Sequence, residues 1–232
     1  MRTHDRKRDR CSEAEPEAVV AFFDAHAHCT SPGFSGCLVA SDLEGWAELV
    51  DQAGENPVAL GIHPWVAEGV SWPEIQARLA QLPHQAHGEI GLDKTRPNVE
   101  SQRDVFLAQL SCATKPLVIH SVRAHAEVLK LLKQTAQQEG MVHDFVGSLE
   151  EALAYIRQGL YVSFGPRLLR SPKAQRAAQR VPLERLLIES DAERVADLSR
   201  IEEVAARLAV LREIPLRTLI AHTAANARRL FL

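Results

Sequence analysis

The stretch PLVIH (residues 116–120) is a short, uninterrupted apolar run that ends in a histidine. A run without polar alternation is typical of a strand buried on both faces, as in a parallel sheet covered by helices. Similar runs lie along the rest of the chain, at residues 19–25, 36–40, 57–61, 85–91, 140–143, 159–164 and 185–190. Stretches with helical periodicity separate most of these runs. The alternation predicts a (β/α)8 barrel, with the last helices packed outside it.

The helical stretches are residues 46–54, 72–82, 101–113, 124–138, 148–159 and 171–181. One connection is short for this fold. Only CTSPGFS (29–35) separates the first two apolar runs, whereas a parallel crossover normally takes a dozen or more residues. Either the first crossover helix is missing and the barrel is distorted there, or the second run is not the neighbour of the first.

The composition is that of an ordinary globular protein, with 46% hydrophobic and 25% charged residues among 232. We expect one barrel domain over residues 19–232, preceded by a flexible charged tail over residues 1–18, whose basic cluster could alternatively bind nucleic acid. The net charge of −3 gives no global basic field for nucleic acid. The absence of C-x-x-C pairs and of long apolar runs predicts a cytoplasmic protein outside the membrane. Nothing in the sequence indicates an obligate protein partner.

Metal-capable side chains stand at or just after the ends of most of the apolar runs. In a barrel, the carboxyl ends of all strands surround one mouth, so these side chains should converge there. They are Asp24, His26, His28, His63, Glu89, His120, His143 and Asp191. The other histidines considered fall in helical or loop settings and are interpreted as structural or surface residues: His84, His87, His125 and His222.

The H-x-H spacing of His26 and His28 has a geometric reason. Residues i and i+2 of a strand project to one face, so both imidazoles can bind the same ion, and Asp24 shares their side. Imidazole suits Zn, Mn or Fe, and carboxylates can bridge two ions. Each residue alone is equally compatible with a turn, a satisfied core histidine or a structural ion pair. Four histidines and two carboxylates together exceed one four-coordinate ion and suit a pair of divalent metals.

The ordered segments of the chain resemble the TatD family of metal-dependent hydrolases, which are amidohydrolase-like barrels. The segments that carry the resemblance are DAHAH (24–28), GIHP (61–64), GEIGLD (88–93), PLVIHS (116–121), HDFVGS (143–148), LLIESDA (186–192) and NARRLF (226–231). The resemblance extends from about Phe22 to Phe231 and also includes QRDVFLAQL (102–110).

The resemblance implies two divalent ions, of Zn, Mg or Mn, at the mouth of the barrel. The implied ligands are His26, His28 and Asp191 on one ion, His120 and His143 on the other, and Glu89 bridging both. The resemblance further implies that His63 contacts the substrate phosphate rather than a metal. We interpret Asp24 as a residue that orients the ligands or water from behind them.

Several positions on the substrate side depart from the family pattern. Lys94 stands where a tyrosine commonly follows G-L-D, and Val122 stands where an arginine usually follows H-S, with Arg123 next to it. Asp144 also replaces a usual residue of the segment H-C-F-S-G-S. Lys94 and Arg123 remain candidates for holding phosphate, provided that they face the mouth. The presumed ligands are retained, so metal chemistry is a firmer inference than DNA as the substrate.

We therefore predict a divalent-metal-dependent hydrolase, namely a phosphodiesterase or deoxyribonuclease in which a metal-activated water attacks phosphorus. Asp191 and Glu89 are the predicted catalytic carboxylates, with Asp191 orienting the water or accepting its proton. Two other interpretations stay open. The same centre could hydrolyse a carboxylic ester, lactone or amide, or the protein could be non-catalytic and keep a metal for stability.

Overall fold

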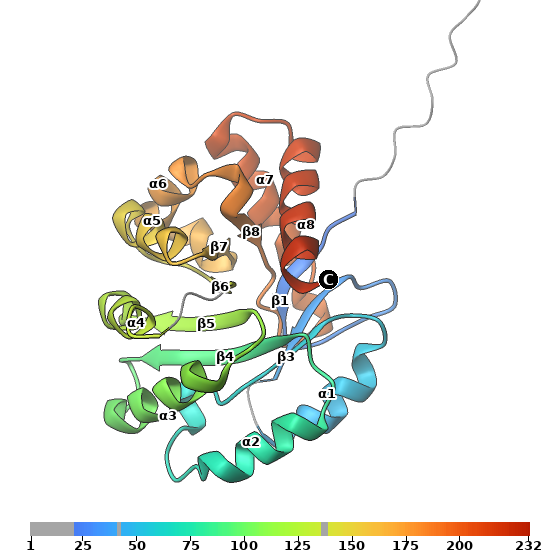
Figure 1. The fold of residues 1–232 in the computed structure, drawn as a ribbon. Helices are drawn as coiled ribbons and strands as arrows, with labels where there is room; N and C mark the ends of the chain where they lie inside the picture. Colours follow the sequence, from blue (N-terminus) through green and yellow to red (C-terminus); the bar gives the residue numbers. More distant parts are fainter. Residues whose placement is uncertain (1–20, 41–42, 136–138) are drawn as a thin grey trace, which may run out of the picture.

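The structure is a computed structural model that describes residues 21–40, 43–135 and 139–232. The predicted tail over residues 1–18 lies outside this part of the chain. Eight strands form a single parallel sheet in which spatial order follows chain order (Figure 1). They are β1 (Asp24–Ala27), β2 (Gly36–Val39), β3 (Val58–Leu60), β4 (Ala86–Asp93), β5 (Leu117–Val122), β6 (Gly140–Val142), β7 (Leu160–Phe164) and β8 (Leu186–Ile188).

The sheet curves round until its last strand meets its first. The backbone N–H of Asp191, just after β8, donates to the carbonyl of His26 in β1 at 3.0 Å. The N–H of His28 donates to the carbonyl of Ala192 at 2.9 Å. These bonds bring the two edges together into a nearly closed barrel, so the (β/α)8 prediction is confirmed.

Helices cover the outside of the sheet. They are α1 (Trp46–Ala53), α2 (Trp72–Gln81), α3 (Val99–Cys112), α4 (His125–Leu132), α5 (Leu149–Arg157), α6 (Pro172–Arg180), α7 (Arg200–Arg212) and α8 (Leu216–Phe231). The prediction of a helix over residues 124–138 was wrong for residues 133–135, and its last three residues, 136–138, lie outside the described part of the chain. Helix α4 ends at Leu132, where its buried apolar residues end, and the chain continues in tight turns with Gln134 N–H bonded to the carbonyl of Leu131. Among the described helices, none is both long and apolar enough to span a membrane.

The connection between β1 and β2 resolves the alternatives that the short spacing left open. The two strands are parallel neighbours, with Asp24 paired to Gly36 and Ala27 to Leu38. Residues 28–35 join them without any helix. The first crossover helix is therefore missing, and His28 lies directly on the short connection that replaces it.

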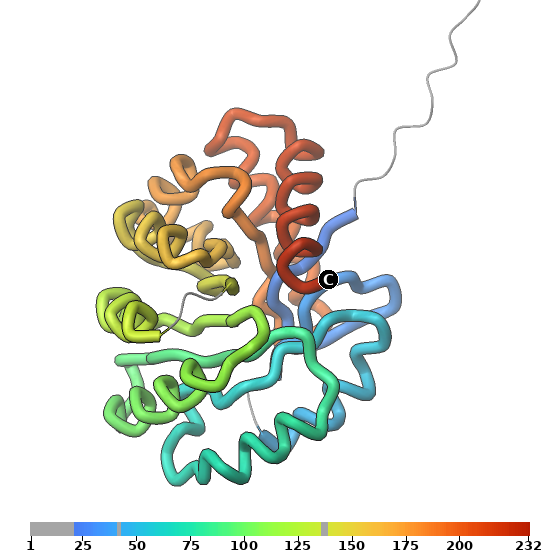
Figure 2. The backbone as a smooth tube through the Cα atoms, in the orientation of Figure 1, coloured from blue at the N-terminus to red at the C-terminus, as the bar shows by residue number. Residues whose placement is uncertain are grey.

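The barrel interior is closed at the end opposite the mouth by the C-terminal helix. Mostly small and medium-sized strand residues, with Tyr161 of β7, fill this interior together with Ala224, Ala227, Leu230 and Phe231 of α8. The rings of Phe23 and Phe231 stack with centroids 6.4 Å apart, and α8 ends beside the start of β1 (Figure 2). Of the predicted strand over residues 19–25, residues 19–20 lie outside the described residues; β1 begins at Asp24, after Phe23, which packs against α8.

Candidate metal centre

The mouth of the barrel contains a cavity of about 410 Å³. Six of the residues singled out in the sequence line it: His28, His63, Glu89, His120, His143 and Asp191. His26 is fully buried beneath them. Glu89 and His120 do not end their strands as the apolar runs suggested, because β4 continues to Asp93 and β5 to Val122. The structure therefore brings the six predicted ligands together from five separate segments of the chain, and His63 joins them from a sixth.

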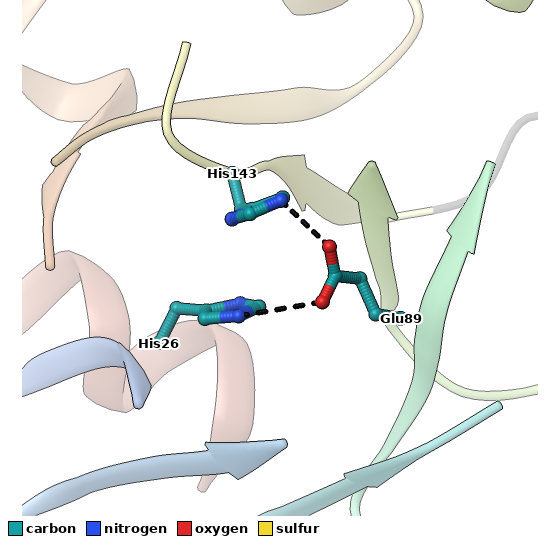
Figure 3. A group of neighbouring side chains, drawn as sticks. All are labelled: His26, Glu89 and His143. Atoms are coloured by element: carbon teal, nitrogen blue, oxygen red, sulfur yellow. Dashed lines mark ion pairs between the residues drawn. The ribbon is translucent and has the colours of Figure 1, made fainter. Parts of the chain in front are cut away.

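Glu89 lies at the middle of the group, and its two oxygens face different histidines (Figure 3). Oε1 is 2.7 Å from Nε2 of His143 and 2.5 Å from Nδ1 of His120. Oε2 is 3.5 Å from Nε2 of His26. A carboxylate that presents one oxygen to each of two nitrogen groups has the arrangement that bridging of two cations requires.

The first group consists of His26, His28 and Asp191. The Nε2 atoms of the two histidines lie 3.2 Å apart, and Oδ1 of Asp191 is 3.7 Å from one and 3.6 Å from the other. The Nδ1–H of His28 donates to the carbonyl of Val39 at 2.8 Å. This bond fixes the tautomer, so Nε2 of His28 presents a lone pair to the group, as metal-binding histidines do.

The second group consists of His120 and His143. Their inward nitrogens, Nδ1 of His120 and Nε2 of His143, lie 3.1 Å apart. Each ring is held from behind by a carboxylate: Nδ1 of His143 is 3.3 Å from Oε1 of Glu189, and Nε2 of His120 is 3.5 Å from Oδ2 of Asp93. A carboxylate behind an imidazole orients the ring toward a metal and makes its inward nitrogen a stronger ligand. The donor set thus fits divalent cations.

The pKa shifts in the group also favour the binding of cations. Burial opposes ionisation of Glu89, but the surrounding histidines hold its pKa well below its ordinary value. Burial likewise opposes protonation of His143, yet Glu89 and Glu189 hold the pKa of His143 well above its usual range. Despite burial, contact with His28 lowers the pKa of Asp191. The carboxylates therefore remain ionised near neutral pH and available to a cation.

Asp24 lies behind this group rather than in it. Its Oδ1 accepts hydrogen bonds from the backbone N–H of His26 at 3.2 Å and of Ser190 at 3.0 Å. Burial raises the pKa of Asp24 to about 7. One carboxylate thus ties the strand that carries His26 to the segment that carries Asp191.

The two basic side chains that the sequence proposed for binding phosphate do not line the cavity. Lys94 pairs with Glu127 at 2.8 Å, and Arg123 is exposed with a backbone φ of 53°. Neither residue lines the cavity, because each follows an inward-facing residue of β4 or β5 at the end of its strand. The arginines that do line the cavity are Arg167, Arg170 and Arg200.

Sequence reasoning passed over two of the supporting carboxylates. Asp93 ends the segment GEIGLD and also accepts a hydrogen bond from Nε1 of Trp65 at 2.8 Å. Glu189 precedes Asp191 by two residues and accepts from the backbone N–H of Asp144 at 2.6 Å. Both residues lie within segments that carry predicted ligands. The position of Asp93 at the end of its segment and that of Glu189 two residues before Asp191 could have identified them from the sequence.

Of the histidines set aside as structural or surface residues, His87 was placed in the wrong setting. It lies inside β4 and is only 5% exposed. The predicted strand run over residues 85–91 already contained His87, so its assignment to a helical or loop setting was inconsistent with that run. His125 opens α4 and contacts the hydroxyls of Ser121 and Tyr155 at 2.9 and 3.1 Å, in a buried cluster away from the cavity lining.

Two glutamines of α3 support the segments that reach the cavity. The side-chain amide of Gln109 accepts from the backbone N–H of Ile62 at 2.7 Å and donates to the carbonyl of Ile62 at 3.1 Å. Gln102 makes the same pair of bonds to the backbone of Asp93, at 2.8 and 3.2 Å. These bonds fix the chain immediately before His63 and at the end of β4.

Replacing Gln109 with Leu is expected to lower the free energy of unfolding by about 2 kcal/mol, because both buried backbone groups of Ile62 lose their partners. Urea denaturation followed by far-UV circular dichroism measures the effect. Gln52→Leu, on the exposed face of α1, should change stability by less than about 0.5 kcal/mol. Equal stability of the two variants would show that the Gln109 bonds are dispensable.

Comparison with known proteins extends over nearly the whole chain. Residues 13–232 match the family described as TatD related DNase. The chain is 31% identical to the uncharacterized metal-dependent hydrolase YjjV of Escherichia coli over 208 residues, or 75% of this chain and 80% of that protein. It is 26% identical to human deoxyribonuclease TATDN3 over 92% of this chain and 96% of that one. The crystal structure of Escherichia coli YjjV, a TatD homolog, superposes with a TM-score of 0.77 at 26% identity, covering 90% and 97% of the two chains.

Proposed function

This chain belongs to the family of TatD-related DNases and is a metal-dependent hydrolase, and from the geometry of its centre we propose that it cleaves phosphodiester bonds. The proposed activity is that of a phosphodiesterase or deoxyribonuclease, with DNA as the first substrate to test. The observation that carries the proposal is the placement of Glu89 between two histidine groups. The name of the human relative, a deoxyribonuclease, supports the choice of substrate.

We assign two divalent ions to the centre, of Zn, Mg or Mn. His26, His28 and Asp191 would hold one, His120 and His143 the other, and Glu89 would be shared. When bound, such ions lower the pKa of water toward neutrality and neutralise charge that develops on the phosphoryl oxygens. The carboxylates and imidazoles of the chain set where these ions sit.

Asp191 is the ligand best placed to act on water as well. Its side chain is 32% exposed in the cavity, whereas that of Glu89 is 3% exposed. Its lowered pKa keeps the carboxylate ionised. An ionised carboxylate that is open to the cavity can orient an attacking water or accept its proton.

His63 has a different tautomer from the ligand His28, and this supports a role in binding substrate. The backbone N–H of Trp65 donates to Nδ1 of His63 at 3.2 Å, so the ring proton is on Nε2. That nitrogen faces the centre, 3.4 Å from Oε1 of Glu89. Burial lowers the pKa of His63 and keeps the ring neutral. His63 therefore presents an N–H donor that suits a phosphoryl oxygen.

The test is to measure bound metals in the purified protein and to assay DNA and bis(p-nitrophenyl) phosphate with added Mg, Mn and Zn. We expect metal-dependent diester hydrolysis that chelation by EDTA abolishes. The variant His26→Ala/His28→Ala should lose metal and at least about 10³-fold in turnover, since it removes two ligands of one ion. The matched variant His84→Ala/His222→Ala removes two histidines outside the cavity. It should keep its metal content and its turnover.

Each contrary result has a distinct meaning. A His26→Ala/His28→Ala variant that binds metal and turns over like the wild type would overturn the ligand assignment. Hydrolysis of carboxylic esters, lactones or amides without diester turnover would move the same centre to that chemistry. A protein that is inert with every metal offered would be non-catalytic.

A further inference from the structure

Resting on the proposed function, we propose that the arginines along one side of the cavity form a second anion subsite, which binds a phosphate group of the substrate other than the one that is cleaved. The residues are Arg167 and Arg170, on the short helix η2 (Pro166–Arg170) after β7, and Arg200, the first residue of α7. All three line the same cavity as the metal centre. The preferred substrate is accordingly a short nucleotide that carries a terminal phosphate in addition to its diester.

The chain holds one of these guanidinium groups in place. Nε of Arg167 donates to the carboxylate of Asp144, and Nη2 donates to the carbonyl of Asp144 at 3.0 Å. Asp144 is 3% exposed and follows His143 directly. The two bonds leave Nη1 of Arg167 free to bind an oxyanion, and they fix the plane of the guanidinium before any ligand arrives.

The other two arginines have no carboxylate partner within the described part of the chain. Ion pairs among the described residues engage neither Arg170 nor Arg200. Helix α7 packs against η2, so the segments that bear these arginines lie together. Besides Asp144 and the proposed ligand Asp191, Glu193 is the carboxylate that lines this side of the cavity. With Asp191 assigned to the proposed ions, the three guanidinium groups face two carboxylates, Asp144 and Glu193, which leaves one net positive charge there for a phosphate group.

The opposite side of the cavity has a different chemistry. Trp65, which is 51% exposed, and Val122 line it, and the guanidinium of Arg96 lies over the Trp65 ring, 4.2 Å from its centroid. The arginine on this side is thus stacked on the indole and does not line the cavity, so this side offers apolar contact to a base rather than a second phosphate site. The cleaved phosphate lies between the two sides, at His63 and the proposed ions. The further phosphate then falls on the arginine side.

The experiment compares three dinucleotides that share one diester: dithymidylate with free hydroxyl ends, and the same compound phosphorylated at its 5′ or its 3′ end. For the wild-type holoenzyme we expect one phosphorylated form to be preferred at least about tenfold in kcat/KM, chiefly through KM. Arg170→Gln/Arg200→Gln should reduce that preference to less than about twofold. Arg194→Gln should retain it, because Arg194 is 79% exposed and pairs with Asp197 outside the cavity.

A binding measurement separates this inference from the proposed activity. Calorimetric affinities of thymidine 3′,5′-bisphosphate and of the two thymidine monophosphates should show the same preference for the second phosphate, and the same loss in Arg170→Gln/Arg200→Gln. That pattern without diester turnover would keep the subsite and reject the phosphodiesterase. Diester turnover with no preference for a second phosphate, or with a preference that the double variant retains, would overturn the subsite.

Discussion

Replacing Glu89 with Gln is expected to lower diester turnover by at least about 10³-fold, equivalent to roughly 4 kcal/mol of transition-state stabilisation. The carboxylate offers one oxygen to His26 and the other to His120 and His143. An amide has one oxygen acceptor, and its NH2 group would face imidazole nitrogens that should bind cations. The substitution of Glu89 by Gln also removes the negative charge at the centre of the histidine groups. Metal analysis should show reduced metal content, and steady-state kinetics on bis(p-nitrophenyl) phosphate should show the loss in kcat.

Glu127→Gln is the matched control for this substitution. Glu127 pairs with Lys94 and Arg103 near the end of β4 but does not line the cavity. Its replacement should leave metal content unchanged and turnover within about twofold, since exposed ion pairs contribute little. Thermal unfolding of both variants checks that they are folded. If Glu89→Gln kept its metals and its turnover, the assignment of Glu89 as the shared ligand would have to be abandoned.

Replacing Gly91 with Ala is expected to destabilise the fold by about 3 kcal/mol or more. Gly91 lies in β4 with a φ of 147°, a conformation that residues with a side chain rarely adopt. A Cβ atom there would stand 1.9 Å from the backbone oxygen of His120. Strands β4 and β5 would have to separate, at the point where they carry Glu89 and His120. Thermal or urea unfolding measures the loss of stability.

Gly69→Ala isolates the steric part of this effect. Gly69 also has a positive φ, of 73°, but a Cβ there would meet no atom within 4 Å. Its replacement should cost about 1 kcal/mol, from backbone strain alone. Equal losses in the two variants would mean that β4 and β5 need not approach so closely. A folded Gly91→Ala protein should also bind metal more weakly than the Gly69→Ala protein.

The sequence predicted the barrel because most strands coincide with a short, largely apolar run separated from the next by a connection. PLVIH forms most of β5. The short connection CTSPGFS left two alternatives open, and the pairing of β1 with β2 shows that the missing crossover helix is the right one. The ends of strands were harder to locate. Glu89 and His120 are polar and therefore resemble strand ends in the sequence. In the structure, β4 and β5 remain paired past both residues, as far as Asp93 and Val122.

In the candidate site, too, some residues could be identified from the sequence and others could not. The proposed ligands could be picked out because a histidine or carboxylate beside a buried strand is chemically conspicuous. Lys94 and Arg123 could not be placed, since a change of one residue at a strand end turns a side chain to the opposite face. Arg167 and Arg170 gave no signal, because they lie on a short helical turn whose orientation depends on its packing against α7. Tertiary contacts, and not local pattern, determine this part of the site.

The stacking of Phe23 on Phe231 has a consequence for the order of folding. The two rings belong to opposite ends of the described chain, and between them the strands each pair with a neighbour through a non-local connection. Contacts that join distant parts of a chain are slow to form, because the entropy of loop closure must be overcome first. Partly folded chains must therefore carry an open barrel whose apolar interior is exposed to water. Hydrogen-exchange protection of β1 should accordingly appear together with that of α8, after the helices nearer the middle of the chain have docked.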